Sequence, residues 1–236
     1  LFAFEFCTSL SSIAIPHNVT KIGHSAFSAC HSLTSIIIPD SVTRINGSTF
    51  YFCTSLTSIT IPKGVTKIDK FAFSNCTSLQ SIIIPDSVTE IPEYAFADCH
   101  SLKSITIPGS VTEIGKYAFA DCHLLTSITI PDSIKKISKS MFERCKSLTF
   151  ITIPDGITEI GYGAFLKCTS LRKIICNNPD LFTDSNIQNR NQIQFISTTD
   201  YFNDNYQDLI EAIKHTGVNS NHVSSKELDL IIKLHQ

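Results

Sequence analysis

Residues 94–116 read Tyr-Ala-Phe-Ala-Asp-Cys-His-Ser-Leu-Lys-Ser-Ile-Thr-Ile-Pro-Gly-Ser-Val-Thr-Glu-Ile-Gly-Lys, and this 23-residue pattern recurs along most of the 236-residue chain. Four residue types keep one position over seven or eight copies. The four series are Cys7, Cys30, Cys53, Cys76, Cys99, Cys122, Cys145 and Cys168; Phe4, Phe27, Phe50, Phe73, Phe96, Phe119, Phe142 and Phe165; Leu10, Leu33, Leu56, Leu79, Leu102, Leu125, Leu148 and Leu171; and Pro16, Pro39, Pro62, Pro85, Pro108, Pro131 and Pro154. A fixed interval of this size predicts a solenoid, in which each repeat forms one coil.

The middle of the repeat predicts a short strand with one buried side. Ile105 and Ile107 alternate with Ser104 and Thr106, so the two isoleucines point to one face and the hydroxyls to the other. Pro108 follows directly and ends the strand, because proline has no N–H to give to a sheet.

The second half of the repeat predicts the segment that connects one strand to the strand of the next coil. Val111 and Ile114 fit a less regular extended segment. Ala118, Phe119 and Cys122 then fall at i, i+1 and i+4, which is compatible with one helical or 3₁₀ turn that buries a bulky ring. Since 23 residues enclose too little volume to bury these side chains alone, each coil must pack on its neighbours.

Composition excludes several classes of function. The formal net charge is −2 and no basic tract is present, so we expect no nucleic-acid partner. The longest apolar runs, such as 36–39 and 82–85, are far shorter than the roughly 20 residues of a membrane span. We therefore expect no membrane span.

The cysteines are expected to be unpaired and buried. Nine is an odd number, and equivalent residues of stacked coils lie about 4.8 Å apart with parallel Cβ vectors, which suits a disulfide poorly. Cys30-His31, Cys99-His100 and Cys122-His123 resemble metal or nucleophile pairs. However, a cysteine facing inward and a histidine facing outward cannot share one zinc ion. We predict no metal, no catalytic residue and no cofactor.

The unit A-F-x-x-C-x-S-L-x-x-I-x-I-P-x-x-V-T-x-I-G resembles the BspA-type, or treponemal-type, leucine-rich repeat over residues 3–176. This resemblance implies a leucine-rich-repeat solenoid with a parallel β-sheet on its concave face and short β segments with 3₁₀ or helical turns on its convex face. Family members are commonly cell-surface or secreted proteins that bind host proteins. The unpaired cysteines also permit an intracellular or host-cytosolic location.

Two regions follow from where the repeat stops. Residues 1–176 hold about eight repeats, the first one incomplete, and 177–236 form a C-terminal capping region. There Pro179 opens a short helix, and the strand 192–197 pairs with 171–176 as an atypical last coil. An apolar stripe over 202–213 and a capping box at 224–227 predict two helices, which cover the last coil or bind a partner. The N-terminal coil has no cap, so its apolar edge permits self-association.

Candidate binding residues stand out against small hydroxyl side chains on the strands. The leading patch is Phe150 with Arg172 and Lys173, accompanied by Lys103 and by the exposed Ile37, Ile83 and Ile175. Aromatic and arginine side chains are enriched at binding hot spots. A second candidate is the series Phe71, Tyr94 and Tyr117.

The sequence therefore predicts a non-enzymatic scaffold that binds a protein ligand of unknown identity. The alternative is a repeat region that targets or orients an enzymatic activity in missing flanking sequence, and a structural spacer is a third hypothesis.

Overall fold

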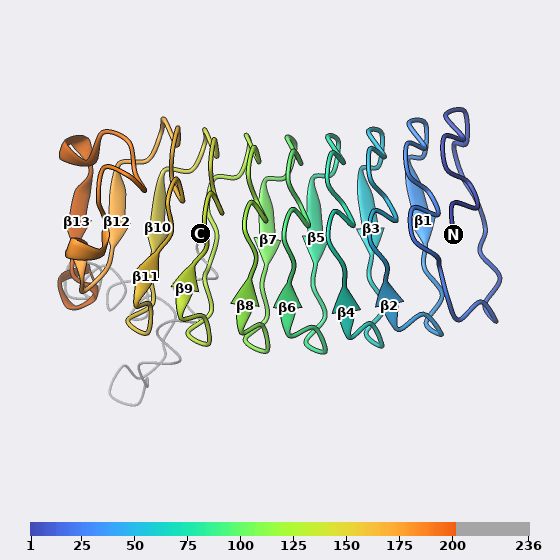
Figure 1. Ribbon diagram of the computed structural model, residues 1–236, viewed down its shortest axis with the longest axis horizontal. Helices are drawn as coiled ribbons and strands as arrows, with labels where there is room; N and C mark the ends of the chain where they lie inside the picture. The colour runs from blue at the N-terminus through green and yellow to red at the C-terminus, as the bar shows by residue number, and fades with distance from the viewer. Residues whose placement is uncertain (202–236) are drawn as a thin grey trace, which may run out of the picture. The chain divides into compact units, whose positions relative to one another are not determined.

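The computed structural model describes residues 1–201, and the chain divides into one unit at Leu1–Phe195 and another at Ile196–Gln236. The first unit is a solenoid of parallel strands, in which successive coils lie side by side in chain order (Figure 1). The strands fall into two rows, and the side chains between these rows form the core.

The first row is the main sheet, and its strands follow the predicted alternation. It consists of β1 (Ser35–Ile37), β3 (Ser58–Thr60), β5 (Ser81–Ile83), β7 (Ser104–Thr106), β10 (Phe150–Thr152), β12 (Lys173–Ile175) and β13 (Gln194–Ile196). The strand order is β1-β3-β5-β7 in one part and β10-β12-β13 in the other. Ser35 pairs with Ser58 and Ser81 with Ser104, so the register equals one repeat. Between the two parts, Thr129 forms a single bridge to Thr152.

The second row contains shorter strands, where the sequence predicts the less regular extended segment. They are β2 (Arg44–Ile45), β4 (Lys67–Ile68), β6 (Glu90–Ile91), β8 (Glu113–Ile114), β9 (Lys136–Ile137) and β11 (Glu159–Ile160). In each of them the charged first residue is exposed and the isoleucine is buried.

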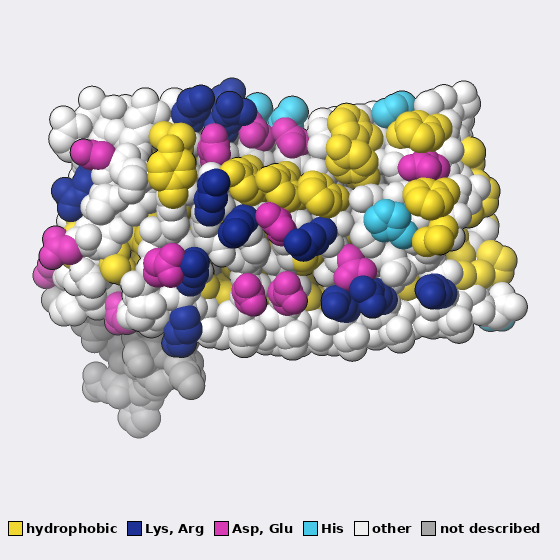
Figure 2. Space-filling view, viewed as in Figure 1, with side chains coloured by type: hydrophobic (Ala, Val, Ile, Leu, Met, Phe, Trp, Pro, Cys, Tyr) yellow, Lys and Arg dark blue, Asp and Glu magenta, His cyan; other side chains and the backbone are white. Residues whose placement is uncertain are grey.

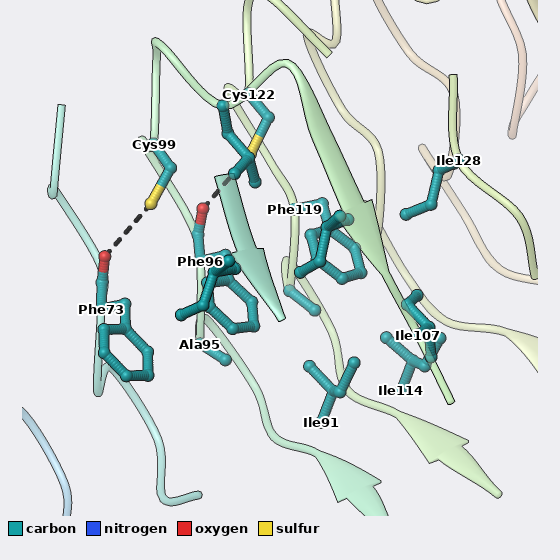
Figure 3. Close-up of a cluster of buried hydrophobic side chains, with 14 of the residues drawn as sticks. Phe73, Ile91, Ala95, Phe96, Cys99, Ile107, Ile114, Phe119, Cys122 and Ile128 are labelled. Carbon is teal, nitrogen blue, oxygen red and sulfur yellow. Dashed lines mark hydrogen bonds between the residues drawn. The ribbon is translucent and has the colours of Figure 1, made fainter. Parts of the chain in front are cut away.

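The phenylalanine series forms one buried column. Phe73, Phe96 and Phe119 are fully buried, and their rings lie one behind another (Figure 3). The ring centroids of Phe73 and Phe96 are 5.4 Å apart and the planes differ by 1°. Burying a ring of roughly 150–200 Å² at about 25 cal/mol per Å² contributes several kcal/mol before entropy is counted. The column is therefore a substantial source of stability between coils.

The cysteines form a second buried column with a specific hydrogen bond. The thiol of Cys99 donates to the carbonyl oxygen of Phe73 at 3.2 Å, and that of Cys122 to Phe96 at 3.3 Å (Figure 3). Burial raises the pKa of the Cys53 thiol to about 12. All nine cysteines are free, which confirms the prediction of unpaired thiols. Cys7 is exposed, unlike the other eight.

The segment expected to form a helical turn consists of β-turns instead. The amide of Ala120 donates to the Tyr117 carbonyl at 3.2 Å, and that of Cys122 to Phe119 at 3.3 Å. Tyr117 and Asp121 both have φ of 58°, a left-handed conformation that is strained for residues other than glycine. Hydrogen bonds to the next coil, such as Phe96 N–H to Ala118 O at 2.9 Å, help to stabilise these turns.

The last coil departs from the repeat. It contains the 3₁₀ helices η1 (Pro179–Leu181) and η2 (Arg190–Gln192) before β13. The amide of Gln194 donates to Arg172 O at 2.8 Å, and β13 lies beside β12 as predicted. The helices expected over 202–213 and after 224 lie outside the described residues. Across residues 1–201, no helix reaches the length and hydropathy needed to cross a bilayer.

Candidate protein-interaction surface

The outward face of the main sheet carries small hydroxyl side chains at its first position. Ser35, Ser58, Ser81 and Ser104 are all exposed. At the third position Ile37 and Ile83 are 82% and 73% exposed, and Thr60 lies between their strands. Because every strand repeats the register of its neighbour, this part of the face is nearly uniform.

The uniform face is interrupted where Phe150 and Lys173 replace the serines. Phe150 of β10 pairs in register with Lys173 of β12, and both side chains are half-buried. Arg172 is exposed, and its Nη1 donates to the carbonyl oxygens of Thr169 and Leu171, both at 2.9 Å. Phe150 and Lys173 are thus neighbours across two strands, and Arg172 precedes Lys173 in the chain; we call these three residues the Phe150 patch.

Lys103 and Ile175 differ in their relation to this patch. Lys103 is exposed and precedes β7; it occupies the position of Arg172 three repeats earlier, or about 14 Å away at the spacing of strands. It therefore lies on the same side of the sheet without touching the patch. The expectation that Ile175 is exposed is wrong, since only 1% of it is accessible. Its strand adjoins the atypical last coil, where the symmetry that exposes Ile37 and Ile83 ends.

The second candidate series is a stack of rings on the turns. The ring centroids of Phe71 and Tyr94 are 4.8 Å apart, and those of Tyr94 and Tyr117 are 4.7 Å apart. Lys139 Nζ lies 5.8 Å from the centroid of Tyr117. Figure 2 shows a face on which hydrophobic side chains form a central row between acidic and basic ones. The faces of the stacked rings contact one another, so mainly their edges are available to a partner.

The Cys-His pairs place the imidazoles on the surface, where two of them stack. The centroids of the His100 and His123 rings are 4.5 Å apart and the rings are nearly parallel. The two histidines are 23 residues apart, so they occupy equivalent positions in adjacent coils. His123 Nε2 lies 3.3 Å from Asp121 Oδ1. Burial, then the charges of His100 and Lys146, lower the pKa of His123 despite this carboxylate. Within residues 1–201 no three side chains are arranged to hold a metal ion.

The main sheet also has a charge pattern that no single residue of the sequence indicates. The segments that form the sheet and lead into it contain no aspartate or glutamate in any of seven successive repeats. The segments are 31–38, 54–61, 77–84, 100–107, 123–130, 146–153 and 169–176. An alignment of the repeats, compared position by position for charge, reveals this absence of acidic residues.

The chain is similar to solved bacterial leucine-rich-repeat structures. A T. pallidum leucine-rich-repeat protein is 32% identical over 68% of this chain and 78% of that one, with a TM-score of 0.63. A leucine-rich cell surface protein from Faecalibacterium prausnitzii is 32% identical over 83% of this chain and 62% of that one, with a TM-score of 0.56. A leucine-rich-repeat protein from Eubacterium ventriosum is 31% identical, with a TM-score of 0.61, over 67% of this chain and 43% of that one.

This chain thus spans less than two thirds of the Faecalibacterium and Eubacterium proteins. No curated protein matches it significantly. The sequence profile of the BspA type leucine-rich repeat region matches residues 1–103 and 89–208, with six copies. With its 23-residue register, buried phenylalanine column and parallel sheet, the chain belongs to the BspA-type leucine-rich repeat family.

Proposed function

We propose that this protein is a non-enzymatic scaffold whose main sheet binds a protein partner through the Phe150 patch. The observation that carries this proposal is the replacement of two serines by Phe150 and Lys173 on neighbouring strands. Together with Arg172, they place aromatic and cationic groups on a face where β1, β3, β5 and β7 present serines at the first strand position. Such groups supply much of the binding free energy in protein interfaces.

The chemistry of the thiols supports a non-enzymatic role. Cys30, Cys99 and Cys122 adjoin histidines in sequence, yet all three are buried. Burial raises the pKa of each thiol, which opposes formation of the thiolate nucleophile. A binding role requires none of these groups to react.

The proposed place of action is a cell surface or the secreted fraction, where the partner belongs to a host. Support comes from the Faecalibacterium protein, which is described as a cell surface protein. Unpaired cysteines are compatible with an oxidising environment because eight of the nine are buried.

A capture experiment tests the proposal. The immobilised chain is incubated with biotinylated surface proteins of cultured epithelial cells, and the recovered proteins are quantified. We expect the double variant Phe150→Ala/Arg172→Glu to reduce recovery of the partner at least fivefold. The control Tyr162→Ala/Lys116→Glu makes the same chemical changes at exposed residues outside the main sheet and should leave recovery unchanged.

Because Phe150 is half-buried, unfolding of each variant is measured in urea, and Lys173→Glu provides a patch variant that keeps the aromatic ring. Equal recovery with folded patch variants and with wild type would show that the patch is not the binding surface.

A further inference from the structure

The main sheet is the part of the repeat from which carboxylates are excluded. All thirteen acidic residues of 1–176 lie outside the seven sheet segments. Cationic side chains do occur there: Lys103, Arg172 and Lys173 on the sheet and Lys146 at its edge. A partner that docks on this sheet therefore meets hydroxyls, apolar groups and positive charge.

The cations on the sheet lack an acidic neighbour, unlike other cations of the protein. Arg44 pairs with Asp69 at 2.7 Å and Lys136 with Glu159 at 2.7 Å. In contrast, Lys103, Arg172 and Lys173 form no ion pair with any residue of 1–201. Arg172 is held by two carbonyl oxygens, which orient the guanidinium but leave its charge uncompensated.

The three cations of the sheet lie at the amino-terminal ends of its strands. Lys103 directly precedes β7, and Arg172 directly precedes β12. At the other end of the strands, the position after the proline holds Asp40, Asp86, Asp132 and Asp155, and one cation, Lys63. Two carboxylates, Asp98 and Asp121, lie just before sheet segments at the amino-terminal side, but there they pair with His100, and with His123 and Arg144. In the coils near β10, an anionic ligand is therefore favoured at the amino-terminal ends of the strands, and Asp132 and Asp155 disfavour it at the carboxyl-terminal ends.

We propose that the main sheet binds an extended acidic segment of a protein partner, which lies across the amino-terminal ends of β7, β10 and β12. This inference rests on the proposed function and names the chemistry of the partner. About 14 Å separates the Lys103 and Arg172 columns, which an extended peptide covers in about four residues at roughly 3.3 Å each. Two acidic residues four apart, with an apolar residue between them, match Lys103, Phe150 and Arg172.

A peptide fits this pattern better than a densely charged polymer does. The cations number three on the sheet, and the strands before β7 offer serine and threonine hydroxyls with Ile37 and Ile83. A polymer with one charge per unit would leave most of its charges facing neutral groups. A peptide can alternate charged, hydroxyl and apolar side chains.

The probe is a fluorescein-labelled peptide, Ser-Glu-Ser-Leu-Ser-Glu-Ser, titrated with the full chain and followed by fluorescence anisotropy. Its counterparts carry Gln or Lys in place of both Glu residues. We expect the Glu peptide to bind more tightly than the Gln peptide and the Lys peptide, and its affinity to fall as NaCl is raised.

Charge reversal then locates the site. Lys103→Glu/Lys173→Glu should weaken the Glu peptide at least tenfold and should favour the Lys peptide. The matched control Lys67→Glu/Lys116→Glu changes the net charge equally at exposed residues outside the main sheet, and should alter affinity less than twofold.

Three results would overturn the inference. Equal weakening by both double variants indicates attraction to the whole molecule, and equal binding of the Gln peptide removes the role of charge. Heparin that binds more tightly than the peptide, through the same lysines, assigns the surface to an anionic polysaccharide. If Phe150→Ala/Arg172→Glu still abolishes capture in any of these cases, the proposed function stands and only the acidic chemistry fails. Conversely, if Phe150→Ala/Arg172→Glu leaves capture unchanged while the chain still prefers the Glu peptide, the proposed function fails and the acidic chemistry stands.

Discussion

Two columns of stacked rings run along this solenoid, one inside and one outside. Inside, the centroids of Phe73 and Phe96 are 5.4 Å apart, and both side chains are fully buried. Outside, Tyr94 stacks on Phe71 at 4.8 Å, and both rings are only half-buried. The outer stack is the closer of the two, yet its rings face solvent.

The comparison shows that stacking distance reports the register of the coils, and that burial decides how much a ring contributes. Any side chain placed at equivalent positions of adjacent coils is brought to a similar distance, as the His100–His123 pair at 4.5 Å also shows. Removal of apolar area from water supplies most of the free energy. Two columns with similar distances between their rings should therefore contribute different amounts to the free energy of unfolding when their burial differs.

The largest expected effect is at the inner column. Phe96→Ala should lower the free energy of unfolding by about 3–5 kcal/mol, because it removes a buried ring and leaves a cavity between Phe73 and Phe119. Urea denaturation followed by circular dichroism measures it. Phe96→Leu, which keeps most of the volume, is the control and should cost much less. A loss below about 1 kcal/mol for the alanine variant would show that the column is not the core.

A smaller effect is expected at the outer column, in the same repeat. Tyr94→Ala should cost about 1 kcal/mol, since a half-exposed ring loses stacking on both sides but leaves no closed cavity. The same denaturation experiment measures the difference from Phe96→Ala. If the two alanine variants cost the same, burial does not distinguish the columns.

Tyr94→Gly separates the ring from the backbone beneath it. Tyr94 has φ of 59°, and glycine relieves a left-handed conformation by about 1 kcal/mol relative to alanine. The glycine variant should therefore be more stable than the alanine variant. The opposite order would mean that this turn is not strained.

The smallest effect is expected from the outer histidine pair. The folded protein lowers the pKa of His123, first by burial and then through the charges of His100 and Lys146. The unfolded chain thus binds the proton more readily below a pH of about 6.5. His123 should contribute stability that is complete above this pH and is lost as pH falls through the lower folded pKa.

Denaturation midpoints at pH 5 and pH 8 measure this contribution. His123→Gln should reduce the difference between them slightly, whereas His17→Gln, at an exposed residue, should leave the difference as in wild type. A larger difference in His123→Gln than in wild type would contradict the direction of the shift.

The order of the coils and the identity of the core followed from the sequence for a simple reason. Phe96, Cys99 and Leu102 recur at 23-residue intervals with almost no variation, and residues that cannot vary between stacked coils are those that contact one another. The pairing of Phe150 with Lys173 follows from the same interval, because it joins residues one repeat apart.

Other features depend on contacts that the repeat pattern does not encode. The left-handed residues at Tyr117 and Asp121 replace the expected helical turn, because the backbone satisfies its hydrogen bonds with the next coil. Ile175 has the same residue type as Ile37 but is buried, since it lies next to an irregular coil. The thiol of Cys99 has a carbonyl partner that no local pattern identifies.

The sequence alone determined the period, the direction of each strand's side chains and the columns that form the core, because translation by one repeat maps every coil onto the next. Tertiary structure decided the turn conformation, the exposure of each column and the neighbours of the side chains that break the pattern. These depend on how the coils hydrogen-bond and where their regularity ends. For the same reason, the lack of carboxylates on the main sheet acquires meaning only once its segments lie side by side on one face.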